Sequence, residues 1–200
     1  MPELIFGVRE GHIEPSSRVH PTANVWHLAH IRENAVVGAN TTIGRGAIVD
    51  CDVQIGENCK IQNLAQIFRP ARIEDFVFVG PGAILTNDRF PRAASANGSK
   101  KNSEDWNPVG VHLEFGASIG AGAVCVAPLK VGRWAVVAAG AVLISDAKAF
   151  GLYVGIPARL VGWVGRTGKR LVRVADDEFV CPETSQRFTL CSENLSESTL

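Results

Sequence analysis

An aliphatic side chain recurs at every sixth residue through most of the chain. The first run is unbroken over twelve positions: Val19, Val25, Ile31, Val37, Ile43, Val49, Ile55, Ile61, Ile67, Ile73, Val79 and Leu85. A second run in a new phase consists of Leu113, Ile119, Cys125, Val131, Val137 and Leu143. A period of six fits neither the 3.6-residue turn of an α-helix nor a plain hairpin pattern. It predicts short flat strands joined by corners, with three strands to each coil.

Small residues support this prediction. The fourth residue after each aliphatic position is usually alanine, and glycine often follows the aliphatic residue directly, as in Gly38, Gly44, Gly56, Gly80, Gly120 and Gly132. Alanine fits inside a corner where two walls of a narrow core approach, and glycine relaxes the backbone at a turn. Eighteen hexads make about six coils, a prism roughly 29 Å long at about 4.8 Å per coil. The sequence therefore predicts an all-β fold.

The hexad pattern resembles the left-handed parallel β-helix of the hexapeptide-repeat transferases, and the handedness is implied by the resemblance alone. We expect an N-terminal lead-in over residues 1–18 and a β-helix domain over residues 19–164. A short C-terminal extension follows over residues 165–200. One such repeat cannot bury its own apolar face, so the stack depends on contacts between neighbours.

Composition excludes several classes of protein. The 20 basic and 20 acidic residues balance, which argues against a broad nucleic-acid-binding surface. No apolar run reaches the roughly 18 residues that cross a bilayer. Residues 1–15 lack the basic segment followed by an apolar stretch that is typical of a secretory signal peptide. The five cysteines show no disulfide framework and read as reduced thiols. We expect a cytoplasmic protein with no membrane partner.

The repeat is interrupted between Leu85 and Leu113, and the inserted loop spans residues 86–112. Long segments without regular structure inside compact domains are usually functional. The segment NDRFPRA mixes proline, aromatic and basic residues, whereas a passive solvated excursion would be polar throughout. We interpret the loop as part of a binding site, with a passive insertion as the alternative.

Several strings occur in the order found in one branch of the superfamily: VWHLAHI, KIQN, VGPGAILTNDRFPRA, GASIGAGAV and VGIPARLVGWV. Together they resemble the nucleotide-sugar 3-N-acetyltransferases, and the TND-x-F-PR segment resembles the dTDP-sugar members somewhat more than the UDP-sugar members. The resemblance implies transfer of an acetyl group from acetyl-CoA to an amino group, expected at the 3-position, of a nucleotide-linked sugar. It implies a homotrimer with sites between subunits, direct attack on the thioester, and no metal cofactor.

The resemblance implies catalytic roles for Asn87 and Asp88. Asn87 would orient the amine but cannot act as a base, because an amide does not titrate near neutral pH. Asp88 could accept hydrogen bonds from the sugar, and Arg92 could bind a phosphate through its planar guanidinium group. The plainer alternatives are a turn-capping Asn87 and a local Asp88–Arg92 ion pair.

Further substrate-binding candidates lie in the early coils. Trp26 could stack on a nucleotide base or cover a coil end, and His30 could bind substrate, act as a base or be an ordinary surface group. Asn63 lies one coil and one hexad before Asn87, on an adjacent wall, so the two could line one cleft between subunits. Leu64 stands where the resembled branch often has a second asparagine, and a different substrate would explain the change.

The late coils resemble the CoA-binding end of the family. Small residues let an extended pantetheine chain lie against the backbone, and we expect it along Ala139, Gly140 and Ala141. Pro157 would shape the adjacent turn, and Arg159 would lie near the CoA phosphates. For Ala139 and Ala141, the alternative is that they are plain repeat residues.

The C-terminal extension is expected to be metal-free. Relatives with similar tails often carry paired cysteines resembling a zinc ribbon, but here only Cys181 and Cys191 are present and four ligands are needed. Two short strands are expected at residues 171–174 and 179–181, and the last nine residues are expected to be disordered.

Other functions remain open from the sequence. The nearest is an O-acetyltransferase on a sugar or small alcohol, with His30 or His112 as base. A γ-carbonic-anhydrase-like hydratase would need three zinc-binding histidines, for which His27, His30 and His112 are the candidates. A non-catalytic coil serving as an assembly surface is the third alternative.

Overall fold

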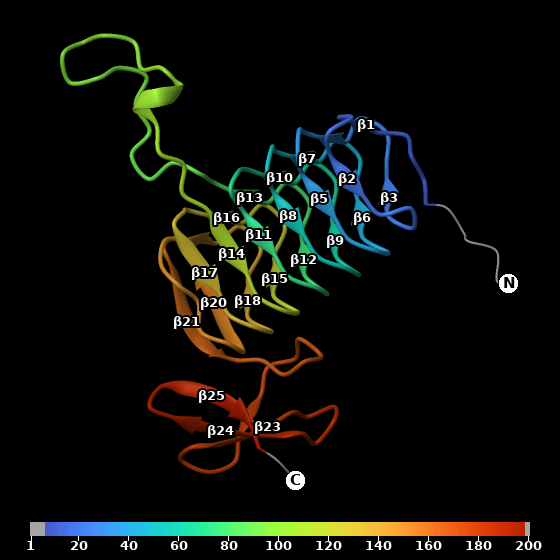
Figure 1. Ribbon diagram of the computed structural model, residues 1–200. Coiled ribbons are helices and arrows are strands. Elements are labelled where there is room, and N and C mark those ends of the chain that lie inside the picture. The colour runs from blue at the N-terminus through green and yellow to red at the C-terminus, as the bar shows by residue number, and fades with distance from the viewer. Residues whose placement is uncertain (1–6, 199–200) are drawn as a thin grey trace, which may run out of the picture.

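A computed structural model describes residues 7–198 and shows a stacked β-coil with a small sheet at its C-terminal end (Figure 1). The coil has three faces. The first is β1 (His12–Ile13), β4 (His30–Ile31), β7 (Ile48–Val49), β10 (Gln66–Ile67), β13 (Ile84–Leu85), β16 (Val124–Cys125) and β19 (Val142–Leu143). The second is β2 (Arg18–Val19), β5 (Val36–Val37), β8 (Gln54–Ile55), β11 (Arg72–Ile73), β14 (Val111–Leu113) and β17 (Leu129–Val131).

The third face is β3 (Asn24–Val25), β6 (Thr42–Ile43), β9 (Lys60–Ile61), β12 (Phe78–Val79), β15 (Ser118–Ile119), β18 (Val136–Val137), β20 (Gly151–Gly155) and β21 (Ala158–Trp163). All pairs are parallel except the β20–β21 hairpin. Equivalent residues in successive coils are 18 apart, as in the pairing of His12 with His30. Three hexads therefore complete one coil, as the period predicts.

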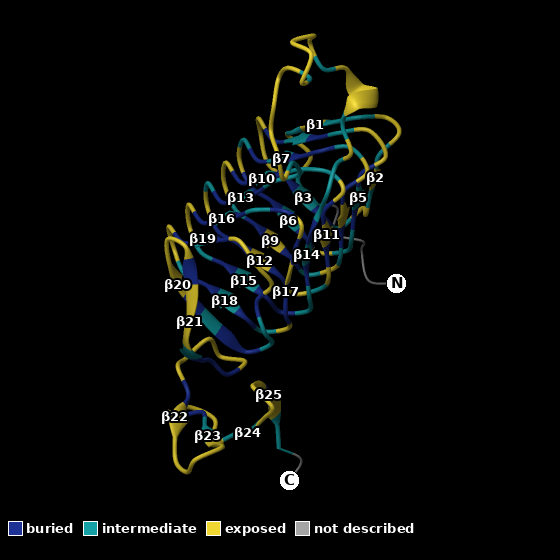
Figure 2. Ribbon diagram, turned by 90° about the vertical axis from the view of Figure 1, so that its left-hand side faces the viewer, coloured by how far each residue is buried: buried dark blue, intermediate teal, exposed yellow. Residues whose placement is uncertain are grey.

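The hexad aliphatic residues fill the core. Val25, Ile43, Ile61 and Leu85 are wholly buried, together with the corner alanines. Figure 2 shows buried segments recurring along the stacked coils. Burial of each such aliphatic side chain contributes about 1.5–3 kcal/mol relative to its exposure. The predicted all-β coil is confirmed, and its strands follow the hexads.

The coil is longer than the six or so turns expected, because its first and third faces each contain seven parallel strands. It also begins earlier. β1, which lies within the residues 1–18 expected as a lead-in, already pairs with the next coil, and so does β2 at the end of that segment. Ile13 lies six residues before Val19 and packs against the core, so it extends the hexad run.

The inserted loop projects away from the coil between β13 and β14 (Figure 1). It carries the short 3-10 helix η1 (Ser103–Asp105). The backbone N–H of Val109 donates to the carbonyl of Asn87 over 3.1 Å, which closes the base of the loop. The loop ends before Val111, two residues earlier than expected, because His112 is already paired within β14.

The C-terminal extension forms an antiparallel sheet of β22 (Val172–Arg173), β23 (Glu178–Val180), β24 (Arg187–Cys191) and β25 (Asn194–Glu197). Phe188 and Leu195 from this sheet share a core with Phe150 and Trp163 of the coil end. This shared core explains why four strands form where two were expected. It also orders residues 194–197, so the expected disorder of the last nine residues is wrong for that segment; residues 199–200 lie outside the described residues.

No helix among the described residues is long and apolar enough to cross a membrane.

Candidate functional site

Two of the expected substrate residues, Trp26 and Asn63, line one hollow of about 280 Å³. The hollow lies at the corner after β3, β6 and β9, and its other lining residues are His27, Thr42, Gly44, Arg45, Ile61 and Gln62. Trp26 is 42% exposed, so its ring is available to a ligand. A methyl group at Gly44 would lie 2.7 Å from Oδ1 of Asn63, so the small residue leaves room for the asparagine.

A chain of polar contacts organises this hollow. The backbone N–H of Arg45 donates to Oδ1 of Asn63 over 3.0 Å. Nε of Arg45 donates to Nε2 of His27 over 2.9 Å, and Nδ1 of His27 lies 3.8 Å from Oε2 of Glu10. The first contact fixes the Asn63 amide through its oxygen, and the second gives the hollow a guanidinium group.

The corner that carries the hollow continues into the later coils as a bare strip. We call Gly82, Gly122 and Gly140 the glycine strip. All three have left-handed backbone conformations with φ between 65° and 67°, and a Cβ at any of them would meet open space. The N–H of Gly140 donates to the carbonyl of Ala121 over 2.8 Å, and Gly122 donates in the same way to Pro81, so these corners stack in register.

Two of the three residues expected to lie along CoA fit this strip. Ala139 and Gly140 are exposed at the corner. Ala141 is different, because its side chain is 1% exposed and points into the core as the small residue of its hexad. The expectation that Ala141 lies on the outer wall is therefore wrong for its side chain.

The hairpin of β20 and β21 brings Pro157 and Arg159 to the same end of the coil. Pro157 is exposed at the hairpin tip after a cis peptide bond, and Arg159 is exposed opposite Val154. The N–H of Ala138 donates to the carbonyl of Tyr153 over 2.8 Å, so the hairpin runs beside the corner of Ala139.

Asn87, Asp88 and Arg92 lie at a different corner, after β13 on the first face. Among the described residues, the Asn87 side-chain amide makes no hydrogen bond, and the residue is half-buried. Oδ1 of Asp88 accepts from the N–H of Phe90 over 2.8 Å, whereas Arg92 donates to the carbonyl of Pro91. The alternative of an Asp88–Arg92 ion pair is thus not formed within residues 7–198, and one chain does not bring Asn63 and Asn87 together.

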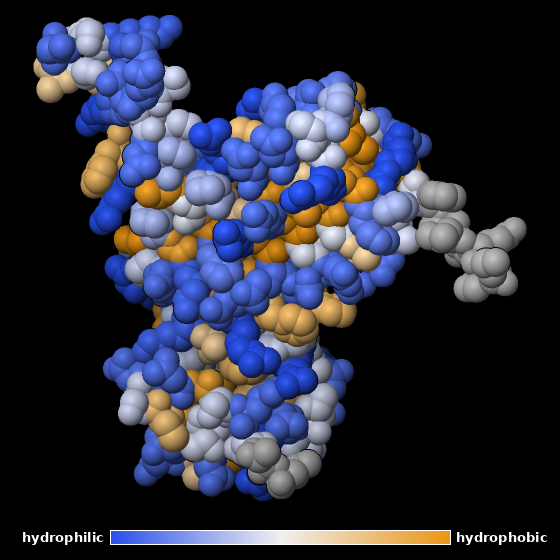
Figure 3. Space-filling model, in the orientation of Figure 1, coloured by the Kyte–Doolittle hydropathy of each residue, from blue (hydrophilic) through white to orange (hydrophobic). Residues whose placement is uncertain are grey.

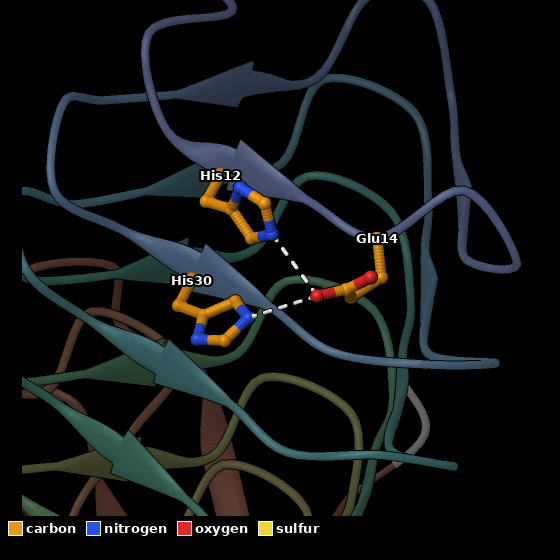
Figure 4. A group of neighbouring side chains, drawn as sticks. All are labelled: His12, Glu14 and His30. Atoms are coloured by element: carbon orange, nitrogen blue, oxygen red, sulfur yellow. Dashed lines mark hydrogen bonds and ion pairs between the residues drawn. The ribbon is translucent and has the colours of Figure 1, made fainter.

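His30 lies far from Asn87 along the same face. Three strand spacings separate β4 from β13, about 14 Å at 4.8 Å each. Within one chain, that distance keeps His30 out of hydrogen-bond reach of an amine held at Asn87. Nε2 of His30 instead lies 3.6 Å from Oε1 of Glu14, which also bonds His12 (Figure 4).

The sequence analysis missed His12 and Glu14. The signal that could have found them is the spacing of 18 residues between His12 and His30, which is one coil. The three histidines considered for a hydratase do not converge: His27 bonds Arg45, His30 lies on the first face, and His112 on the second face bonds Glu74 over 2.9 Å.

Apolar surface remains exposed on the coil, where Figure 3 shows orange atoms in bands among polar ones. Leu28 and Leu64 are 67% and 57% exposed at the corner after the third face. Both have left-handed backbone conformations with φ 61°. Such corners are usually occupied by glycine or asparagine, so two exposed leucines there are unusual.

Comparison with known proteins agrees with this architecture. Residues 34–69 match the family described as bacterial transferase hexapeptide (six repeats). The chain thus carries the hexapeptide repeat over this segment, in the coils of β5 to β10. This hexapeptide-repeat chain is 32% identical over 130 residues to the bifunctional protein GlmU of Exiguobacterium sp., covering 65% of the chain and 25% of GlmU. It is 30% identical to GlmU of Thermotoga maritima over 74% of the chain and 30% of that protein. The chain thus spans less than a third of these relatives.

Solved structures share the fold of the hexapeptide-repeat chain. A hexapeptide transferase family protein from Anaplasma phagocytophilum superposes with a TM-score of 0.58 at 20% identity, covering 76% of this chain and 81% of that one. The acetyltransferase domain of PglB from Neisseria gonorrhoeae gives 0.53 at 20% identity over 72% and 56% of the two chains. The fold is therefore the left-handed parallel β-helix that the resemblance implies.

Proposed function

We propose that this hexapeptide-repeat protein is an acetyl-CoA-dependent N-acetyltransferase acting on the amino group, expected at the 3-position, of a dTDP- or UDP-linked amino sugar. The observation that carries the proposal is the glycine strip, which runs from the Trp26–Asn63 hollow towards the hairpin of Pro157 and Arg159. A strip without side chains accepts an extended thioester arm against the backbone. Arg159 supplies positive charge for the CoA phosphates at its end.

The chemistry needs little from the protein beyond positioning. The lone pair of the neutral amine attacks the carbonyl carbon of the thioester and forms the C–N bond. The C–S bond then breaks, and the departing sulfur takes the proton that the nitrogen loses. Asn87 orients the amine through its unoccupied amide, and holding the two reactants together supplies most of the acceleration. Asp88 and Arg92 bind polar groups of the substrate at the same corner.

The proposed substrate is held between subunits of a homotrimer. Within one chain, Asn63 and Asn87 occupy different corners. In a trimer, the corner of Asn63 in one subunit would face the corner of Asn87 in the neighbouring subunit. Trp26 and Asn63 would then hold the nucleotide in the hollow. His30 could contact only a distal part of an extended nucleotide sugar, because it lies three coils from Asn87.

The similar proteins support an acetyl-transfer function. One solved neighbour is the acetyltransferase domain of PglB, and another is a hexapeptide transferase. Both share this fold at 20% identity, which supports the scaffold and leaves the substrate to the residues of the site. The TND loop, Asn63 and the glycine strip are the features that support a nucleotide amino sugar.

One geometry favours a second candidate, O-acetyl transfer. Nε2 of His112 lies 2.9 Å from Oε1 of Glu74, beside the exit of the inserted loop. A carboxylate that orients an imidazole is the usual arrangement of a general base, and a hydroxyl acceptor needs such a base.

A panel of nucleotide-linked amino sugars and hydroxy sugars with acetyl-CoA, scored by release of free thiol, tests the proposal. We expect turnover with an amino sugar. Asn87→Ala should lower kcat/KM about 10²–10³-fold, because the amine loses its orientation, whereas His112→Gln should change it less than about threefold.

The opposite ranking of these two variants, with turnover of a hydroxy sugar, would establish the O-acetyl alternative. Absence of thiol release with every acceptor, and of acetyl-CoA binding, would remove the transferase proposal altogether. A circular dichroism spectrum of each variant checks that the coil is intact.

A further inference from the structure

His12, Glu14 and His30 form a compact cluster at the N-terminal end of the coil. Their ligand atoms all lie within 4.8 Å of one another (Figure 4). Nε2 of His12 lies 3.0 Å from Oε1 of Glu14, and Nε2 of His30 lies 3.6 Å from the same oxygen. Both imidazoles therefore point their Nε2 atoms at one carboxylate.

The cluster leaves one of its polar atoms unsatisfied. Nε2 of His30 is shielded from solvent and has no hydrogen-bond partner within residues 7–198. A shielded nitrogen without a partner costs free energy, and such atoms call for an explanation such as an ion or a water. Because that nitrogen faces the other two groups, a bound cation would satisfy all three together.

The spacing suits a first-row divalent metal. In a tetrahedral zinc site with bonds of about 2.0–2.1 Å, neighbouring ligand atoms lie about 3.4 Å apart. The distances of 3.0 and 3.6 Å lie on either side of this value. Two imidazoles and one carboxylate are ligands typical of zinc and its neighbours, and the fourth position is left for water. We propose that His12, Glu14 and His30 bind one Zn²⁺-class ion.

The backbone holds the ligands in register before any metal arrives. His12 pairs directly with His30 across β1 and β4, and the two rings lie 4.9 Å apart in an edge-on arrangement. The N–H of Glu14 donates to the carbonyl of Ile31 over 2.9 Å. The ladder therefore fixes the three Cα positions, and binding needs only small side-chain rotations.

The nearby cation does not compete for Glu14. Arg32 occupies the same corner position one coil later, but its guanidinium bonds Asp50 over 2.8 Å and Glu33 over 3.1 Å. Its charge is thus paired with Asp50 and Glu33, and the contacts of Glu14 are with the two imidazoles.

A metal ion at this site would stabilise the N-terminal end of the coil, where β1 is the edge strand. β1 is the terminal strand of the first face and has a neighbour on one side only, β4. An ion bound by His12 and Glu14 from the first coil and by His30 from the second would hold that strand in place. This is a structural role, separate from acetyl transfer, and it differs from the three-histidine set of a hydratase.

Zinc titration of the metal-free full-length protein by calorimetry tests the site, with the melting temperature measured in parallel. We expect one Zn²⁺ per chain with a micromolar Kd, and a melting temperature that rises with zinc concentration because the ion binds the folded state. Glu14→Gln and His30→Gln should each weaken binding at least tenfold.

His112→Gln is the matched control, because His112 and Glu74 form a His–Glu pair with no second imidazole. Its zinc affinity should equal that of the parent protein. The proposal is overturned if His30→Gln binds zinc like the parent, or if His112→Gln loses as much affinity. No substrate is present, so the result is independent of the acetyltransferase assay.

Discussion

At the residue scale, the surroundings of the cysteines set very different acidities. Burial raises the pKa of Cys59 to about 11 and that of Cys125 to about 12, so both remain thiols in the core. Burial also acts on Cys181, but the Thr184 side chain, the backbone of Glu183 and Thr184, and Thr167 hydrogen-bond its thiolate and lower its pKa to about 7. The thiol at the base of the C-terminal sheet is therefore the acidic one.

This acidity predicts a pH-dependent stability. Between about pH 7 and the ordinary thiol value of 9.0, Cys181 is ionised in the folded state and protonated in the unfolded state. The unfolded state then binds more protons, so the contribution of Cys181 to stability grows as the pH rises through this window and is lost as the pH falls through 7. The difference in melting temperature between the parent and Cys181→Ser should widen from pH 7 to pH 9. A difference that stays constant from pH 7 to pH 9 would refute the assignment.

At the element scale, the glycine strip meets two requirements, a left-handed backbone conformation and a surface without side chains. Left-handed corners favour glycine or asparagine, yet in the early coils the left-handed position of this same corner is held by Leu28 and Leu64, both with φ 61°, and by Gly46 between them. At Gly82, Gly122 and Gly140 the corner is left with no side chain at all. Because leucine adopts the same backbone conformation at this corner in the early coils, the three later glycines indicate a requirement for an empty surface in addition to the backbone conformation.

Gly140→Asn separates these two requirements. Asparagine accepts the left-handed conformation, and no atom lies within 4 Å of the new Cβ, so the melting temperature should barely change. The side chain would block the strip, and the KM for acetyl-CoA should rise about tenfold, equivalent to about 1.4 kcal/mol of lost binding. Gly168→Asn is the control, with φ 77° and equally open space in the C-terminal extension. An unchanged KM in Gly140→Asn would place CoA elsewhere.

At the scale of the whole molecule, a flat-walled prism with exposed apolar corners is suited to self-association. Leu28 and Leu64 would be costly in water at left-handed positions, and burial against another subunit would offset that cost. The proposed substrate site also needs a second subunit, because only a neighbouring chain would place its Asn87 corner against the Asn63 corner of the first chain.

Sedimentation equilibrium should therefore give the mass of a trimer. The double variant Leu28→Lys, Leu64→Lys should shift the mass towards the monomer and abolish turnover, because charges at the interface oppose its burial. Val172→Lys, at a residue 53% exposed in the C-terminal sheet, should remain trimeric and active. A stable monomer with full activity would exclude a site shared between subunits.

The sequence by itself determined the coil, because a side chain that recurs every six residues can reach a common core only if the backbone turns a corner at each repeat. It also located the inserted loop, because the loop interrupts the period. It located the exposed corner residues Ala139 and Gly140, because they follow the hexad position of Val137. The same period implies that Ala141 points inward, because it is the fourth residue after Val137. The expectation that it lies on the outer wall overlooked this.

Only the tertiary structure decided which side chains meet. The period already implies that His12 stacks on His30 and that Asn63 and Asn87, 24 residues apart, fall on different corners. It does not imply that Oε1 of Glu14 lies 3.0 Å from Nε2 of His12 and 3.6 Å from Nε2 of His30. The number of strands in the C-terminal sheet likewise depended on contacts with Phe150 and Trp163, which lie outside that sheet. Such contacts depend on distances in three dimensions. The six-residue period fixes the distance only between residues at equivalent positions of successive coils, which are 18 residues apart.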